Sequence, residues 1–136
     1  MKFVIENWYL FATLVVILFM IAWGPVLRRV YGINVAPVVG AINLINRESA
    51  VVVDVCEPGE FKQGHLPHAV NIPLGNLAAR LGELEKYRQK PILVTCRHGN
   101  RSVRGALTLR KNGFPSVYSL GGGLSAWEKE NLPVER

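Results

Sequence analysis

The sequence predicts an α/β domain, in which helices flank a parallel sheet, preceded by one transmembrane helix. Short apolar, β-branched runs alternate with helical patterns over most of the chain, which is typical of a parallel sheet covered on both faces. A long run without charged residues lies near the start of the chain. With 136 residues, the chain is long enough for one domain of ordinary size and one smaller segment.

The apolar run covers residues 8–27. About 20 helical residues at ~1.5 Å each span ~30 Å, which matches the hydrocarbon core of a bilayer. Trp8 and Tyr9 begin the run and Trp23 lies near its other end, as expected for aromatic side chains at the two membrane interfaces. We therefore predict an N-terminal transmembrane anchor over residues 1–30.

Two alternatives to an anchor are a cleaved signal peptide and a buried core helix. A signal peptide needs a clearly basic start and a small-x-small cleavage site. Here Lys2 is the only basic residue before the run, and Ala22, Trp23 and Gly24 form a poor site. A helix that is apolar on every face would need a much larger protein around it to be buried. The anchor is therefore favoured over both alternatives.

The charges that flank the run predict its orientation. Arg28 and Arg29 follow the run directly, whereas Lys2 alone precedes it. Because positive charge is enriched on cytoplasmic flanks, the C-terminal side is expected in the cytoplasm. A reducing cytoplasm also suits a domain that depends on a free thiol.

The basic composition does not predict nucleic-acid binding. The formal net charge is +6, but the Lys and Arg residues are scattered and form no block of five or more. Cys56 and Cys96 are too few for a disulfide scaffold in a chain of this length. His65, His68 and His98 do not combine with the cysteines in any spacing typical of zinc ligands, so no metal site is predicted.

Residues 31–37 are predicted to form a juxtamembrane linker, and residues 38–136 the domain. The expected elements of the domain, in chain order, are a helix over 38–46, a strand over 50–54, a short helix over 58–63, a helix over 74–87, a strand over 91–95, a helix over 101–112, a strand over 116–120 and a helix over 124–130.

Apolar spacing predicts the elements of the first half of the domain. The first helix carries four apolar residues near one face, Val38, Val39, Ile42 and Ile45. The run over residues 50–54 is short, apolar and β-branched, as expected for a buried parallel strand. The helix over residues 74–87 repeats Leu at spacings of four and three residues.

Apolar runs and glycines delimit the elements of the second half. Residues 91–95 form the second clear apolar strand. The helix that follows is expected to stop at Gly113, before Pro115. The three glycines at 121–123 separate the last strand from the last helix, whose Trp127 is predicted to lie in the core.

Two polar residues stand at the ends of predicted strands. Asp54 ends the first strand and Cys96 follows the second. Parallel sheets carry their functional groups at the carboxyl ends of the strands. We therefore predict a site around Cys96, with Asp54 in a supporting role through hydrogen bonds near the loop.

The loop after the second strand has the composition of an anion-binding turn. It consists of Cys96, Arg97, His98, Gly99, Asn100, Arg101 and Ser102. Such a turn directs several backbone N–H groups inward, and the positive end of the following helix points the same way. Arg97 and Arg101 add charge, and Ser102 is expected to cap the helix or to donate to the sulfur.

A thiol in this position is expected to ionise readily, and the thiolate is the reactive form. The alternative is an inert cysteine in the core, since free Cys is often buried. An inert Cys96 would not need a polar loop with two Arg residues directly after it. The sequence therefore favours a reactive Cys96.

The spacing between Cys96 and Arg101 favours one kind of chemistry over another. Cysteine phosphatases use C-x5-R, which leaves room for a phosphate group, whereas this chain has C-x4-R. The tighter loop suits a single sulfur atom bound to Cys96. A phosphatase or arsenate reductase is therefore disfavoured.

Four segments resemble the signatures of a known family, the single-domain rhodaneses. Residues 53–61 (VDVCEPGEF) resemble D-V-R-E-x-x-E-[FY], and residues 64–73 (GHLPHAVNIP) resemble G-H-I-x-G-A-x-N-I-P. Residues 96–102 (CRHGNRS) resemble C-x-x-G-x-R-S, and residues 121–127 (GGGLSAW) resemble G-G-x-x-x-W. The resemblance covers roughly residues 38–132.

The resemblance implies a flavodoxin-like α/β fold and sulfur transfer through a persulfide on Cys96. Cys96 would take the outer sulfur of a donor such as thiosulfate, and a thiol, a thioredoxin-like protein, or cyanide in an assay would accept it. Arg97 and Arg101 would attract the anionic donor and hold the loop, and His98 would influence the choice of substrate. No metal or organic cofactor is implied. The expected location is the bacterial inner membrane, with the rhodanese domain in the cytoplasm.

The chain departs from the family at two places. Cys56 replaces an Arg that steadies the Asp and the loop in the family; it is either a small apolar filler or a second thiol that resolves the persulfide into a disulfide. Pro67 and His68 stand where the family commonly has Gly. His65 is mostly structural in the family, and a role as a base is the less favoured alternative.

The Arg lost at position 56 and the predicted anchor support a second interpretation, a membrane-tethered interaction or scaffold domain with little or no activity. The anchor supports it because turnover of a small molecule does not need a membrane. The complete loop around Cys96 favours the enzyme.

Overall fold

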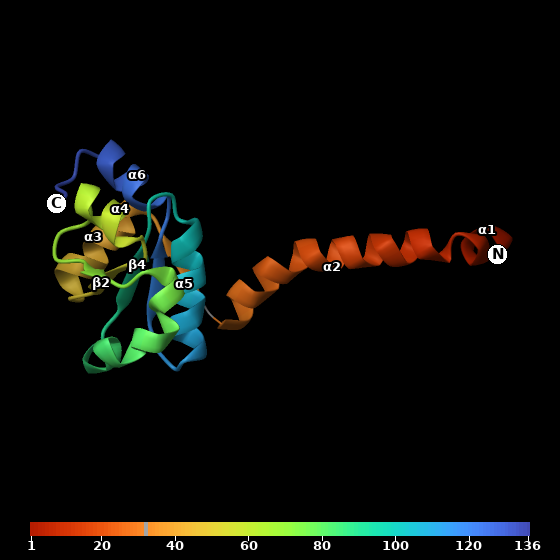
Figure 1. Ribbon diagram of the computed structural model, residues 1–136, viewed down its shortest axis with the longest axis horizontal. Coiled ribbons are helices and arrows are strands. Elements are labelled where there is room, and N and C mark those ends of the chain that lie inside the picture. The colour runs from red at the N-terminus through yellow and green to blue at the C-terminus, as the bar shows by residue number, and fades with distance from the viewer. Residues whose placement is uncertain (32) are drawn as a thin grey trace. The chain divides into compact units, whose positions relative to one another are not determined.

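The computed structural model describes residues 1–31 and 33–136, with the side chains of residues 27–31 excepted. The chain divides into two compact units, Met1–Gly32 and Ile33–Arg136 (Figure 1). Gly32, within the predicted linker, lies outside the described residues, as do the side chains of Arg28 and Arg29.

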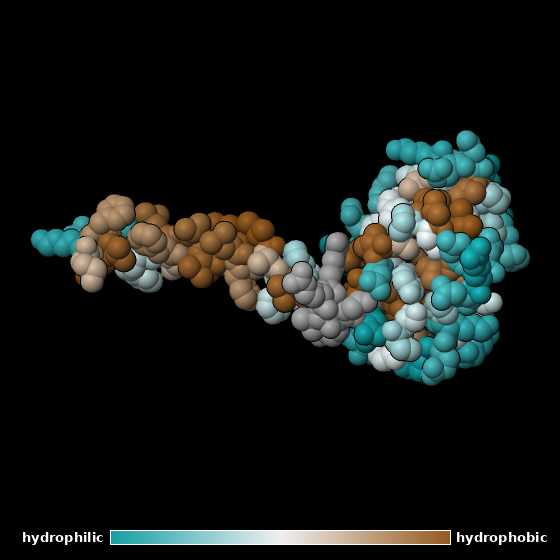
Figure 2. Space-filling view, turned by 180° about the vertical axis from the view of Figure 1, so that it is seen from behind, coloured by the Kyte–Doolittle hydropathy of each residue, from teal (hydrophilic) through white to brown (hydrophobic). Residues whose placement is uncertain are grey.

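The first unit is helical. It contains a short helix α1 (Lys2–Glu6) and a long helix α2 (Trp8–Tyr31). The segment Trp8–Val26 is long and apolar enough to cross a membrane, a property that anchors share with signal sequences. Its side chains are exposed, and Figure 2 shows apolar surface along the helix.

The second unit is built around a five-stranded parallel sheet with the order β1-β5-β4-β2-β3. The strands are β1 (Asn34–Ala36), β2 (Val51–Asp54), β3 (Val70–Asn71), β4 (Ile92–Thr95) and β5 (Val117–Leu120). The three strands predicted from apolar runs are β2, β4 and β5, and they form the centre of the sheet. The predicted fold class, a parallel sheet flanked by helices, is confirmed.

Helices cover both faces of the sheet. One face packs on α3 (Val38–Arg47) and α6 (Gly123–Lys129), where the buried core includes Leu44, Leu93 and Trp127. The other face packs on α5 (Asn100–Lys111). Gly105 of α5 lies so close to this face that a Cβ atom there would stand 3.1 Å from a methyl group of Val94. Neighbouring residues of β4 thus point to opposite layers, as the pleat of a strand requires.

The sheet contains two edge strands that the sequence analysis did not predict. In β1, Val35 pairs with Ser119 of β5, and the amide of Gly121 donates to Ala36 at 2.8 Å. Residues 34–36 therefore belong to the compact unit, although they were expected in the linker. A three-residue strand is too short to show alternation, and its pairing with β5 fixes it. Strand β3 has only two residues, so it too lacks a sequence pattern and is defined by its pairing with β2.

The helix expected over residues 74–87 is not a continuous α-helix. The segment forms two 3₁₀ stretches, η1 (Leu74–Asn76) and η2 (Ala78–Tyr87), and Arg80 departs from helical dihedrals inside the second. Gly75 and Gly82 lower the helix propensity of the segment. The apolar spacing nevertheless identifies the side of the segment that faces the core, because Leu77 and Leu84 are buried.

The short helix α4 (Pro58–Gln63) follows β2, and α5 follows β4. Both helices therefore start at the carboxyl edge of the sheet. The register places Asp54 of β2 beside Thr95 of β4, one residue before Cys96. This edge brings together the residues described next.

Candidate active site

Cys96 lies at the bottom of a tight loop between β4 and α5. Its sulfur accepts a hydrogen bond from the backbone N–H of Gly99 at 2.9 Å and one from the N–H of Ser102 at 3.3 Å. The residue is only 2% exposed. Two amides directed at one sulfur stabilise negative charge on that sulfur. The predicted concavity of inward N–H groups is therefore present, and Cys96 occupies it.

The first turn of α5 begins one residue earlier than predicted. Gly99 is its N-cap and has φ of +98°, a conformation that favours glycine. Ser102 is not a helix cap, contrary to one of the two expectations for it, because it already lies inside α5. Its hydroxyl donates to the carbonyl of Gly99 at 3.0 Å and lies 2.7 Å from the hydroxyl of Ser119. Ser102 thus ties the loop to β5, while its amide holds the sulfur.

The glycine segment before α6 supports the loop from the other side. The amides of Leu124 and Ser125 donate to the carbonyls of Cys96 and Arg97 at 2.8 and 3.0 Å. Gly123 has φ of +59°, and a Cβ atom there would collide with the carbonyl oxygens of these two loop residues. Glycine is therefore required at 123 for steric reasons as well as for its backbone conformation.

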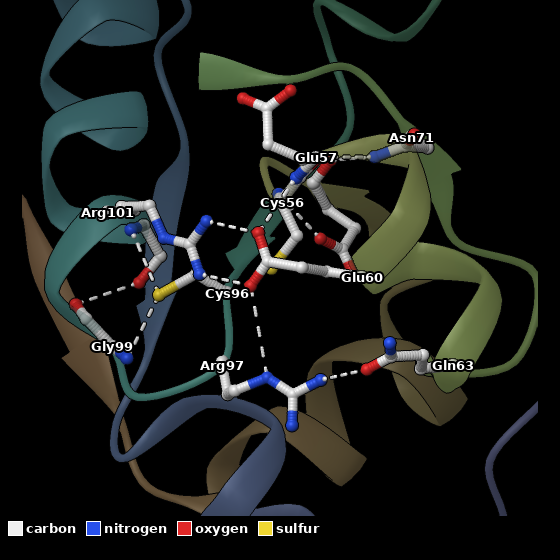
Figure 3. A network of polar contacts seen from close by, with 11 residues as sticks. Cys56, Glu57, Glu60, Gln63, Asn71, Cys96, Arg97, Gly99 and Arg101 are labelled. Carbon is white, nitrogen blue, oxygen red and sulfur yellow. Dashed lines mark hydrogen bonds and ion pairs between the residues drawn. The ribbon is translucent and has the colours of Figure 1, made fainter.

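The two arginines of the loop converge on one carboxylate (Figure 3). Arg101 donates two hydrogen bonds to Glu60 of α4, at 2.7 and 2.9 Å. The Nε of Arg97 lies 3.9 Å from the same carboxylate, and a terminal nitrogen donates to Gln63 at 3.3 Å. Both expected cationic residues are beside the loop, but their charge is opposed by Glu60.

The Arg101–Glu60 pair changes the titration of both groups. The hydrogen bonds from Arg101 lower the pKa of Glu60 to about 2. The hydrogen bonds from Glu60 in turn raise the pKa of Arg101. The pair is ionised at neutral pH and holds the side chain of Arg101 against α4.

A capping box positions Glu60. Glu57 is the N-cap of α4, its side chain accepts from the amide of Glu60, and its own amide donates to Glu60 Oε1 at 3.2 Å. Pro58 at the start of the helix fits the backbone dihedrals of a first turn. The carboxylate of Glu60 is thus held on the side of the helix that meets Arg101.

Asp54 ends β2, and Cys56 follows it in the turn that leads to α4. Oδ1 of Asp54 accepts the amide of Cys56 at 2.8 Å, and the side chain of Asn71 donates to the carbonyls of both residues. Burial raises the pKa of Asp54, partly offset by this amide. Asp54 therefore organises the β2–α4 turn, and its carboxylate accepts from the amide of Cys56 instead of from the Cys96 loop.

Cys56 is buried and is a free thiol, as is Cys96. Burial, followed by the charge of Asp54, raises the pKa of Cys56 to about 12. A thiol with this pKa stays protonated at neutral pH and is a poor nucleophile. The interpretation of Cys56 as a small filler is favoured over a redox role.

The histidines take different places. His65 stacks on Phe61 with ring centroids 3.6 Å apart, and its Nδ1 lies 2.7 Å from the Phe61 carbonyl, so this nitrogen carries the proton. Its backbone pairs with Glu135 near the C-terminus, which supports a structural role. His98 is exposed in the loop, with Nδ1 3.1 Å from the hydroxyl of Ser125. Asn100 starts α5 and is exposed.

Over the described ranges, 1–31 and 33–136, no three His, Cys, Asp or Glu side chains cluster closely enough to hold a metal ion. The site instead presents one sulfur, two amides directed at it and two arginines shared with a carboxylate. Such an arrangement suits a covalent adduct of one small atom on Cys96.

Sequence reasoning missed Glu60, Gln63 and Gly123 as parts of the site. Glu60 stands at the Glu of the first signature, so a signal for it was present. Its partner could not be identified because the contact spans 41 residues of chain. The three glycines at 121–123 carried a signal too, but their contact with the loop depends on the fold.

Comparisons with known proteins agree with this geometry. The sequence profile of the rhodanese-like domain matches residues 40–130. The uncharacterized protein YibN of Escherichia coli K12 is 40% identical over 97 residues, which is 71% of this chain and 68% of that protein. The thiosulfate sulfurtransferase GlpE of Pseudoalteromonas translucida is 34% identical and covers 64% of this chain and 81% of that enzyme. A rhodanese-related protein of Thermoplasma volcanium superposes with a TM-score of 0.68, at 30% identity, over 75% of this chain and 97% of that one.

Proposed function

The chain belongs to the rhodanese-like domain family, and we propose that it is a sulfurtransferase that carries sulfane sulfur as a persulfide on Cys96. The observation that carries the proposal is the pair of amides, of Gly99 and Ser102, that donate to the Cys96 sulfur. They stabilise negative charge on the one atom that would carry the transferred sulfur.

In the first step, the Cys96 thiolate attacks the outer sulfur of a donor such as thiosulfate. A new S–S bond forms, the S–S bond of the donor breaks, and sulfite leaves with the electron pair. The persulfide then bears the negative charge, and the loop amides are placed to donate to it. The chain has C-x4-R spacing, which suits the single sulfur added in this step.

In the second step, the thiolate of an acceptor attacks the outer sulfur of the persulfide. The acceptor becomes a persulfide, and Cys96 leaves as the thiolate with which the cycle began. A small thiol or a thioredoxin-like protein serves as acceptor, and cyanide replaces it in an assay. The cycle consumes no oxidant and requires no cofactor beyond the cysteine itself.

Turnover in the full chain, kept in detergent micelles, tests the proposal. Sulfite release from thiosulfate and sulfur transfer to cyanide are measured for the wild type, Cys96→Ser and Cys56→Ser. We expect Cys96→Ser to lose all transfer and Cys56→Ser to retain it. If the wild type transfers no sulfur from any donor, the scaffold interpretation replaces the enzyme.

We also propose that residues 1–30 anchor the domain in a bacterial inner membrane as a single pass. The support is the apolar helix over Trp8–Val26 and the basic pair that follows it in the sequence, which favours a cytoplasmic domain. The linker is then short, because the compact unit begins at Ile33.

Membrane fractionation tests the anchor and its direction. We expect the full-length chain to stay in the membrane fraction after alkaline extraction. Protease added to intact spheroplasts should leave the domain uncut, whereas protease added to inside-out vesicles should cleave it. A shortened chain released from the membrane would show that the helix is a signal sequence.

A further inference from the structure

We infer that Glu60 sets the class of sulfur donor, so that the site prefers a thiol hydropersulfide, R–S–SH, to dianionic thiosulfate. The inference rests on the proposed function. It differs from the expectation that Arg97 and Arg101 attract an anionic donor, because the structure pairs both arginines with a carboxylate.

The geometry of the pair shows how much of the arginine charge is already engaged. Arg101 uses two nitrogens on the two oxygens of Glu60, at 2.7 and 2.9 Å, which is the bidentate arrangement. Arg97 lies 3.9 Å from the same carboxylate through Nε and donates to Gln63 through another nitrogen. In Figure 3 the guanidinium of Arg101 faces Glu60, whereas Arg97 approaches Glu60 with its Nε and extends toward Gln63.

The charges at the loop cancel when the cysteine is ionised. Arg97 and Arg101 bring two positive charges, and Glu60 and the Cys96 thiolate bring two negative ones. The formal charges therefore give a dianion that approaches the sulfur no net attraction, and the loop amides are the remaining source of positive potential. Lys62 and Arg104 are exposed cations on α4 and α5, and solvent and salt screen their contribution.

The two donors place different demands on this neutral group. Thiosulfate brings two negative charges to a thiolate, so the reacting pair carries three. A protonated hydropersulfide brings none: the thiolate attacks its outer sulfur, the R–S bond to that sulfur breaks, and RS⁻ leaves while the proton stays on the transferred sulfur. Glu60 engages both arginines of the loop, so neither offers the first reaction an uncompensated charge, whereas the second reaction does not need one.

The charge dependence gives the inference a quantitative form. Coulomb energy is proportional to the charge of the donor. Removing the charge of Glu60 should therefore raise kcat/KM for a donor of either negative charge. The factor for a dianion should be the square of the factor for a monoanion. For groups exposed to solvent, we expect removal of this charge to raise kcat/KM roughly tenfold for thiosulfate and at most roughly threefold for a hydropersulfide.

The test uses Glu60→Gln in the full chain. Glutamine keeps an oxygen that can accept the amide of Glu57, so the helix cap is preserved. The matched control is Glu83→Gln, because Glu83 also binds an arginine with two hydrogen bonds, at 2.6 and 2.9 Å, but on η2. The probes are sodium thiosulfate and cysteine hydropersulfide, with sulfur transfer to cyanide as the readout.

The informative quantity is the ratio of kcat/KM for thiosulfate to kcat/KM for the hydropersulfide. A change in the reactivity of Cys96 affects both donors alike and cancels in this ratio, whereas a change in electrostatic selection does not. We expect the wild type to prefer the hydropersulfide, and we expect the ratio to rise roughly threefold or more in Glu60→Gln and to stay constant in Glu83→Gln. Added salt should reduce the difference between Glu60→Gln and the wild type.

Two results would overturn the inference. One is a wild type that uses thiosulfate as well as the hydropersulfide, and the other is a ratio that does not change in Glu60→Gln. In both cases sulfur transfer itself persists, so the proposed function stands. If neither donor loads the wild-type protein, the proposed function fails and this inference fails with it.

Discussion

Substitution of Gly123 by Ala tests the support of the loop by the glycine segment. Gly123 has φ of +59°, and an added Cβ would stand 2.8 Å from the carbonyl carbon and oxygen of Arg97 and even closer to the carbonyl oxygen of Cys96. These are backbone atoms, so no side-chain rotation relieves the collision. Either the loop or the start of α6 must move.

The magnitude follows from the contacts that would be lost. A left-handed Ala costs about 1–2 kcal/mol. The amides of Leu124 and Ser125 hold the loop carbonyls, and losing these two hydrogen bonds costs about 1 kcal/mol each. The free energy of unfolding should therefore fall by roughly 3 kcal/mol, which lowers Tm by roughly 10–20 °C for a unit of this size.

Activity should fall further than stability alone explains. A displacement of the loop by about 1 Å costs roughly a hundredfold in rate when it misplaces a reacting group. We expect kcat/KM for sulfur transfer to fall by this factor at a temperature where Gly123→Ala is still folded. Circular dichroism of the full chain gives Tm, and the cyanide assay gives kcat/KM.

The matched control is Gly82→Ala. Gly82 has no heavy atom within 4 Å of the site for a Cβ and no positive φ. The substitution should leave activity and Tm unchanged or raise Tm slightly, because Ala is the better helix former. Wild-type activity and Tm in Gly123→Ala would refute the reasoning about the loop.

Three further predictions follow from the buried and paired groups. Because the pKa of Cys56 is raised to about 12, Cys56 should resist alkylation by iodoacetamide at pH 8 in the native chain and should react once the chain is unfolded. Peptide mass spectrometry follows the labelling. Rapid labelling of the native chain would contradict the assignment of Cys56 as an inert thiol. Because burial raises the pKa of Asp54, Asp54→Asn should be as stable as the wild type or more stable at pH 7. Asp54→Ala should lose about 1–3 kcal/mol of unfolding free energy, because the amide of Cys56 is left without its acceptor. Chemical denaturation measures both variants, and equal losses would contradict this reasoning. The pKa of Glu60 lies at about 2, below its ordinary 4.5, so its stabilisation is complete above pH 4.5 and is lost as the pH falls toward 2. Glu60→Gln should therefore be less stable than the wild type by about 1 kcal/mol at pH 7 and equally stable near pH 2, the value being reduced for solvent exposure; a difference independent of pH would exclude the ion pair as its source.

The centre of the fold could be predicted from the sequence because its signals are local. Strands β2 and β4 are apolar and β-branched, and the helices that follow them have clear starts and ends. Strand β1 has no such signal: three residues become a strand only because β5 offers them a paired edge. The 3₁₀ geometry of η2 likewise depends on packing that apolar spacing does not encode.

The candidate site divides in the same way. Cys96 and the anion-binding turn after it could be predicted, because the turn is contiguous in sequence. The engagement of Arg101 by Glu60 could not, since it depends on where α4 packs relative to the loop. Ser102 shows the limit of local reasoning, because its backbone amide donates to the sulfur, whereas its hydroxyl donates to the carbonyl of Gly99.

Mass spectrometry of the full chain, after brief treatment with thiosulfate or cysteine hydropersulfide, tests directly whether Cys96 carries sulfur. We expect the gain of one sulfur atom on the peptide that contains Cys96. This sulfur should be lost on addition of cyanide and should be absent in Cys96→Ser. Retention of the added sulfur by Cys96→Ser, or no added sulfur on the wild type with either donor, would contradict the assignment of Cys96 as the sulfur carrier.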